Sequence, residues 1–241
     1  FAITIRDTKI KKITKKLPTL RDKMDPIPLY CMPGMAANSK IFENFNLPPI
    51  FEINLLSWIP PKKDESLSSY AKRMCERVIH KDPILLGVSF GGIIVQEMAK
   101  LISVNKVVIV SSIKNNSELP FTMKMAQKTN IHKFLPTQWI NNIDHLALFA
   151  FGKGIKKRIA LYQRYLSERD PEYLNWAIDK LVHWKQVKIQ KDIIHIHGVS
   201  DTVFPINNLK APFVKIKGGH AIIITQAKWF NEELPKILKK N

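Results

Sequence analysis

The sequence lacks most of the features that mark secreted, metal-clustered or membrane-spanning proteins. It holds only two cysteines in 241 residues, Cys31 and Cys75, too few for a disulfide framework or a cysteine metal cluster. No apolar run is long enough to cross a membrane, and the first residues lack the basic, apolar and small-residue order of a secretory signal. We therefore expect a single-domain cytoplasmic protein, with neither a cofactor nor a bound metal.

Acidic residues are also scarce. The chain has 20 Asp and Glu against 38 Lys and Arg, which gives a net charge of +18. Residues 1–23 carry eight of these basic residues and two Asp. Such an excess raises nucleic acid, anionic membrane or an acidic substrate as partners, but no RNA-binding signature accompanies it. We interpret the charge as a lysine-rich solvated surface and expect no nucleic-acid partner. Residues 1–23, just before Met24, are interpreted as a basic N-terminal extension.

A Gly-x-Ser-x-Gly segment at residues 87–91 is the most informative part of the chain. An apolar run at 84–86 precedes it, and apolar residues at helical spacing follow over 93–102. Small residues two positions on either side of a serine let a strand and a helix approach closely, with the serine on a sharp turn between them. This context favours a nucleophilic Ser89 over a glycine-rich turn with an idle serine.

Two partners for such a nucleophile follow in the chain. Residues 192–198 are predicted to form a buried strand that leaves Asp201 on the next loop, and residues 211–216 form a last strand before His220. The order of serine, acid and histidine, each after its own strand, is typical of one class of serine hydrolase. Taken alone, Asp201 is explained equally well as a residue of a turn or a helix cap. His220 alone has the alternative of an ordinary loop residue. Together they predict His220 as the general base and Asp201 as the carboxylate that orients it.

An oxyanion formed at Ser89 needs two hydrogen-bond donors. The first is the N–H of Phe90, at the start of the predicted helix. The second is predicted to be the N–H of Met35, because Pro33-Gly34 turns the chain after an apolar strand at 27–32 and lets the backbone approach a ligand. The alternative for Pro33-Gly34 is a simple strand-ending turn.

His195 and His197 alternate along the predicted strand at 192–198 and project to the same side, as some zinc ligands do. No third ligand lies near them in the sequence. A pair of histidines facing the core is therefore favoured over a metal site.

These segments together resemble the landmarks of the α/β-hydrolase superfamily: residues 32–35, 87–92, 197–201 and 218–220. The chain looks like a small bacterial-type, esterase-like member over residues 25–240. The resemblance implies an α/β fold with a mostly parallel sheet flanked by helices, and hydrolysis of a carboxylic ester or thioester (EC 3.1 class) through an acyl-enzyme. Pro33 departs from the His that many members carry there, and no opening pair of antiparallel strands is evident before Ile27. The alternative function is a non-catalytic, hydrolase-like protein that binds a ligand or partner.

In this pattern residues 24–117 and 187–241 form the hydrolase core, and residues 118–186 form a helical cap inserted between strands. Aromatic residues of the insertion, Trp176 and Trp184 among them, form either the roof of an apolar pocket or the core of the cap itself. A basic cluster in the insertion suggests docking of an acidic carrier protein or of coenzyme A phosphates, with a solvated helix face as the alternative. The cluster consists of Lys153, Lys156, Lys157, Arg158 and Arg164.

Overall fold

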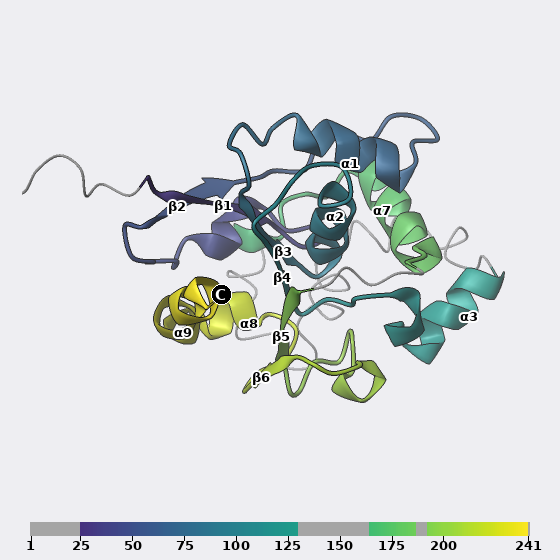
Figure 1. Ribbon diagram of the computed structural model, residues 1–241. Helices are drawn as coiled ribbons and strands as arrows, with labels where there is room; N and C mark the ends of the chain where they lie inside the picture. Colours follow the sequence, from purple (N-terminus) through teal and green to yellow (C-terminus); the bar gives the residue numbers. More distant parts are fainter. Residues whose placement is uncertain (1–24, 130–163, 187–191, 241) are drawn as a thin grey trace, which may run out of the picture.

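A computed structural model describes residues 25–129, 164–186 and 192–240 of the chain (Figure 1). Its centre is a six-stranded sheet in the order β2-β1-β3-β4-β5-β6, in which every pair of neighbouring strands is parallel. The strands are β1 (Ile27–Met32), β2 (Phe51–Leu55), β3 (Ile84–Val88), β4 (Lys106–Val110), β5 (Ile193–Gly198) and β6 (Val214–Ile216). Parallel strands all end at the same edge, so the loops after β1, β3, β5 and β6 lie near one another.

The central strands read as continuous apolar runs because helices cover both of their faces. All five residues of β3 are buried, as are the last four of β4. The helices are α1 (Leu67–Cys75), α2 (Phe90–Met98), α3 (Phe121–Thr129), α7 (Pro171–His183), α8 (Ile222–Thr225) and α9 (Ala227–Lys239), with 3₁₀ turns η2 (Ser39–Phe42), η3 (Asn116–Glu118) and η6 (Ile206–Asn208).

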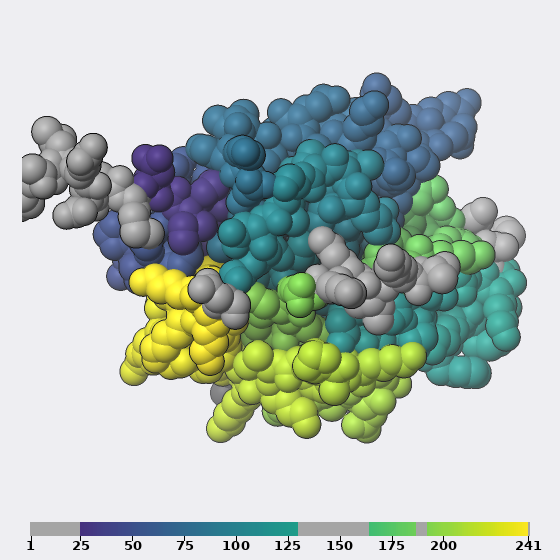
Figure 2. Space-filling model, viewed as in Figure 1, coloured from purple at the N-terminus to yellow at the C-terminus, as the bar shows by residue number. Residues whose placement is uncertain are grey.

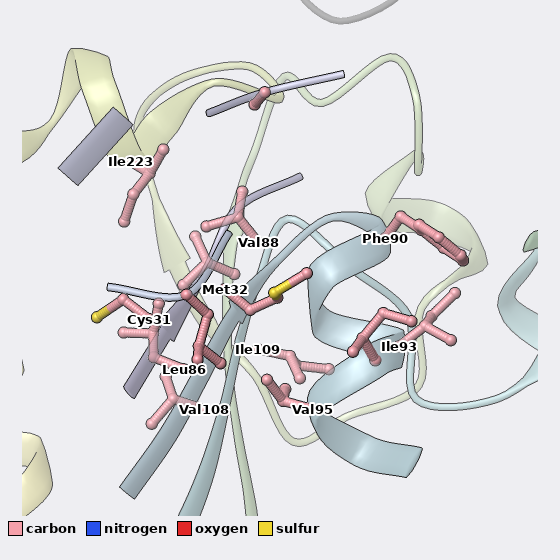
Figure 3. Packing of buried hydrophobic residues seen from close by; sticks show 14 of the residues in the cluster. Cys31, Met32, Leu86, Val88, Phe90, Ile93, Val95, Val108, Ile109 and Ile223 are labelled. Atoms are coloured by element: carbon pink, nitrogen blue, oxygen red, sulfur yellow. The ribbon is translucent and has the colours of Figure 1, made fainter. Parts of the chain in front are cut away.

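The helices divide between the two faces of the sheet. α1 packs on α2, which contacts β1, β3 and β4, while α8 contacts both α9 and η2. Figure 1 shows α1 and α2 on one side of the strands and the C-terminal helices, in yellow, on the other, and in Figure 2 the yellow C-terminal residues lie below the blue residues of α1. Every residue of α2 is buried, which makes it the central helix of the fold. Figure 3 shows part of the core that β1, β3, β4 and α2 build between them.

The predicted α/β class with a parallel sheet is confirmed, and most strand positions agree with the sequence patterns. β1 covers Ile27–Met32 as expected, and β5 breaks at Gly198. α2 begins at Phe90, as expected. One boundary differs: β6 contains only Val214–Ile216, because Pro212 lacks the N–H that a longer strand would donate. β2 was not anticipated, although its five residues alternate apolar and polar side chains, because the run is short; only Phe51 of the strand is buried.

Two helices of the predicted insertion, α3 and α7, lie between β4 and β5 in the chain. α7 packs against the core through Trp176, whose ring lies 4.4 Å from that of Tyr70 and 6.0 Å from that of Phe90. The indole N–H groups of Trp176 and Trp184 donate to the Glu65 carbonyl and the Glu97 carboxylate. Both tryptophans are thus buried in the contact between α7 and the core. Within the described ranges, no helix is long and apolar enough to span a membrane.

Candidate active site

Ser89 occupies a sharp turn between β3 and α2. Its φ of 53° and ψ of −121° lie in a region that glycine favours and other residues rarely adopt. The turn is tight enough to exclude side chains at both flanking glycines. A Cβ on Gly87 would lie 2.3 Å from the Gly91 carbonyl oxygen, and one on Gly91 would lie 2.2 Å from the Pro33 carbonyl oxygen. The Gly-x-Ser-x-Gly pattern therefore has a steric cause in this chain.

Neighbouring strands hold the strained turn in place. The Ser89 N–H donates to the Val110 carbonyl at the end of β4, at 2.9 Å. The Ser112 hydroxyl donates to the Ser89 carbonyl at 2.7 Å. Because these bonds fix the backbone on both sides of the residue, the fold over-determines a conformation that costs about 1–3 kcal/mol by itself.

The structure brings the three predicted catalytic residues together. His220 Nε2 lies 2.9 Å from Ser89 Oγ, and His220 Nδ1 lies 2.8 Å from Asp201 Oδ2. An ionised Asp201 only accepts hydrogen bonds, so Nδ1 carries the hydrogen and Nε2 is free to accept from the Ser89 hydroxyl. Asp201 comes from the loop after β5 and His220 from the loop after β6, so the parallel sheet delivers both to one edge.

Asp201 is buried and held by hydrogen bonds on both oxygens. Its Oδ1 accepts from the N–H groups of Val203 and Phe204, at 2.8 and 3.0 Å. Burial by itself raises the pKa of Asp201, but the charge of His220 and the contacts with His197 and His220 outweigh it and hold that pKa well below the usual range. Asp201 is therefore ionised at neutral pH and can stabilise positive charge on His220.

The loop after β1 lies against the serine, as expected for an oxyanion segment. A Cβ added at Gly34 would lie 3.3 Å from Ser89 Cβ, so the chain at Gly34-Met35 passes directly beside the nucleophile. The indole N–H of Trp58 donates to the Gly34 carbonyl at 3.0 Å, and the Trp58 ring stacks on Phe90 at 5.5 Å. Phe90 is the first residue of α2, so its N–H has no acceptor within the helix. Figure 3 shows the Phe90 side chain at this end of α2.

Sequence reasoning missed two residues that support this site. Ser112 and Trp58 fix the serine turn and the oxyanion loop, but each follows its strand without a motif of its own. The only sequence signal was position, since both lie shortly after a strand at the edge that carries the site.

His195 and His197 face each other in the core, with His195 Nε2 3.0 Å from His197 Nδ1. Among the residues that the structure describes, no group of three or more His, Cys, Asp or Glu is arranged to hold a metal ion. The favoured interpretation, a core-facing pair, agrees with this geometry.

Most of the predicted basic cluster lies outside the described residues: Lys153, Lys156, Lys157 and Arg158. Arg164 is described, and its guanidinium forms an ion pair with Glu43. The part of the cluster that can be placed is therefore already neutralised by the protein.

Comparison with known proteins finds similar structures at low sequence identity. No protein-family model matches the sequence, and no curated protein matches it either. Among solved structures, a hydrolase from Pseudomonas aeruginosa is 13% identical, with a TM-score of 0.68 over 89% of this chain and 91% of that one. A lipase-esterase related protein from Clostridium acetobutylicum is 20% identical, with a TM-score of 0.63 over 88% and 94%. The enol-lactonase from Burkholderia xenovorans is 11% identical, with a TM-score of 0.65 over 90% and 93%. Strand order, serine turn and these matches together establish that the chain has the α/β-hydrolase fold.

Proposed function

We propose that the protein is a serine hydrolase that cleaves a carboxylic ester or a thioester through an acyl-enzyme. The observation that carries the proposal is the hydrogen-bonded line from Ser89 Oγ through His220 to Asp201, with Ser89 on a strained turn. The similar structures described as lipase-esterase related protein and enol-lactonase support the choice of an ester bond.

In the proposed reaction His220 accepts the proton of Ser89 as Oγ attacks the substrate carbonyl carbon. The N–H groups of Met35 and Phe90 stabilise the oxyanion, and Asp201 stabilises the imidazolium. The tetrahedral intermediate then collapses: the bond to the leaving oxygen or sulfur breaks, and His220 gives that atom its proton. Water attacks the acyl-enzyme in the same way, and the acid leaves with Ser89 restored.

We propose residues 118–186 as the cap and the region that selects the acyl group. The support is the position of α7, which packs through Trp176 on Phe90 at the start of α2. Because Phe90 directly follows Ser89, α7 lies next to the serine turn, and a cap at that place would exclude water during acyl transfer.

The test compares wild type with Ser89→Ala on p-nitrophenyl esters and acyl thioesters of graded chain length, coenzyme A thioesters included. Wild type should turn over at least one series, and Ser89→Ala should lose at least about 10³-fold in kcat with an unchanged fold. Full activity in Ser89→Ala would contradict the proposal. Saturable ligand binding without turnover would favour the non-catalytic alternative.

A further inference from the structure

A second histidine contacts the carboxylate of Asp201. His197 Nε2 lies 3.2 Å from Asp201 Oδ2, the oxygen that also faces His220, and 2.9 Å from the carbonyl oxygen of Phe204. The side chains of His197 and Asp201 are both fully buried. His197 therefore cannot touch a substrate, and it meets the site only through the loop that carries Asp201.

The hydrogen on His197 Nε2 can be assigned from its neighbours. The Phe204 carbonyl accepts only, and Asp201 is ionised because its pKa is held well below the usual range, so His197 Nε2 must carry a hydrogen. This hydrogen is donated to the Phe204 carbonyl with Asp201 Oδ2 beside it. The peptide N–H of Phe204 in turn donates to Asp201 Oδ1. His197 thus holds both the carboxylate and the loop that supports it.

His195 fixes the other side of the His197 ring. Burial lowers the pKa of His195 to about 3, with smaller contributions from His197 and Lys114, so His195 is neutral and carries one ring hydrogen. If this hydrogen is on Nε2, it is donated to His197 Nδ1 and His197 is neutral. If it is on Nδ1, His197 Nδ1 must donate to His195 and His197 is charged. In both cases His197 Nε2 carries a hydrogen aimed toward Asp201 and Phe204.

We propose that His197 is a positioning residue for the reaction of Ser89: it orients Asp201 and shares the negative charge of the carboxylate with His220. This inference rests on the proposed hydrolase function. Its basis is the pair of histidine nitrogens that face one carboxylate oxygen, at 2.8 Å for His220 and 3.2 Å for His197.

The titratable groups around His197 come from several segments. His195 lies on the same strand, Asp201 on the next loop and His220 beyond Asp201. Lys114, after β4, acts on His195 and is itself near Glu118, 3.9 Å away. Lys215 pairs with His197 in the β5-β6 register, but its side chain is exposed. Since His195 stays neutral and Lys114 lies near Glu118, Asp201 is the charged group that both His197 and His220 face.

Two substitutions separate positioning from mere packing. His197→Gln places an amide nitrogen near the position of Nε2, whereas the shorter His197→Asn reaches only the position of Nδ1. With less charge shared, Asp201 should hold the protonated form of His220 more strongly in His197→Asn. The acidic limb of its kcat/KM profile should therefore move to higher pH by about 0.5–1 unit. kcat should fall by about tenfold with KM unchanged, and His197→Gln should restore both values.

The matched control is Tyr30→Phe, which removes the hydroxyl of a buried tyrosine of β1 that is bonded to another histidine, His80. It should lower the melting temperature without changing kcat or the pH profile. If His197→Asn behaves like Tyr30→Phe, or if His197→Gln is as defective as His197→Asn, the proposed positioning role is wrong.

NMR of protein labelled with ¹⁵N-histidine tests the inference without any substrate. In wild type, His197 Nε2 must show a bound hydrogen. The His220 Nδ1–H signal should move in His197→Asn but stay near its wild-type position in His197→Gln and Tyr30→Phe. An unprotonated His197 Nε2, or a His220 signal that does not respond, would overturn the inference. Absence of hydrolysis with these signals as expected would instead contradict only the proposed function.

Discussion

Replacement of Ser89 by glycine should leave the protein more stable than replacement by alanine, although glycine usually destabilises a fold. Both variants lose the hydroxyl. The difference between them lies in the backbone, because a φ of 53° with a ψ of −121° is strained for alanine and relaxed for glycine.

The size of the effect follows from two opposing terms. Relief of a strained residue contributes about 1–3 kcal/mol to the stability of the glycine variant. The greater conformational freedom of glycine in the unfolded chain lowers the stability of the glycine variant by about 0.4–1 kcal/mol. The net advantage of Ser89→Gly over Ser89→Ala is therefore about 0.5–2 kcal/mol in the free energy of unfolding. For a chain of 241 residues this corresponds to a melting temperature about 1–8 °C higher.

The assay is urea denaturation of both variants, with Lys72→Ala and Lys72→Gly as the matched control. Lys72 is exposed inside α1, where the order should reverse and alanine should be more stable by about 1 kcal/mol. If Ser89→Ala is as stable as Ser89→Gly while the Lys72 pair behaves as expected, the turn at Ser89 holds no strain and the reasoning fails.

Two further predictions concern Asp201 and the glycines of the site. Asp201→Asn should lower kcat by about 10⁴-fold in ester hydrolysis, since His220 would lose its carboxylate partner. Because the pKa of Asp201 is lower in the folded protein than in the unfolded chain, its charge stabilises the fold above the unfolded value of about 3.9. The stability gap between wild type and Asp201→Asn should shrink as the pH falls below about 4, and a constant gap between pH 7 and pH 3 would contradict this. Gly91→Ala should lower both kcat and the melting temperature, because the new Cβ would lie 2.2 Å from the Pro33 carbonyl oxygen. Gly219→Ala should melt within a few degrees of wild type, because the nearest atom to its Cβ, the Ser200 carbonyl oxygen, would be 3.6 Å away. Equal melting temperatures for the two alanine variants would refute the steric argument.

Local patterns were sufficient to predict the centre of this fold. The apolar runs at β3, β4 and β5 are short and bounded, so a buried parallel sheet was the natural interpretation. β2 was missed although its residues alternate apolar and polar side chains, because five residues of alternation are a short signal and an edge strand with one buried residue, Phe51, lacks the continuous apolar run of the central strands.

The candidate site could be predicted from the sequence to a similar extent. Ser89, Asp201 and His220 were found from their order after strands, because parallel topology converts that order into proximity. The contact between His197 and Asp201 was not predicted. It depends on how the loop at 201–204 folds back on β5, and residue spacing carries no information about that path.

The most direct test of the central claim is covalent labelling of the purified protein by a fluorophosphonate probe, read by intact mass and peptide mapping. We expect a single adduct on Ser89 in wild type, absent from Ser89→Ala and much slower to form in a His220→Ala variant. A folded wild-type protein that forms no adduct, or one that is labelled equally in Ser89→Ala, would contradict an activated nucleophile at Ser89.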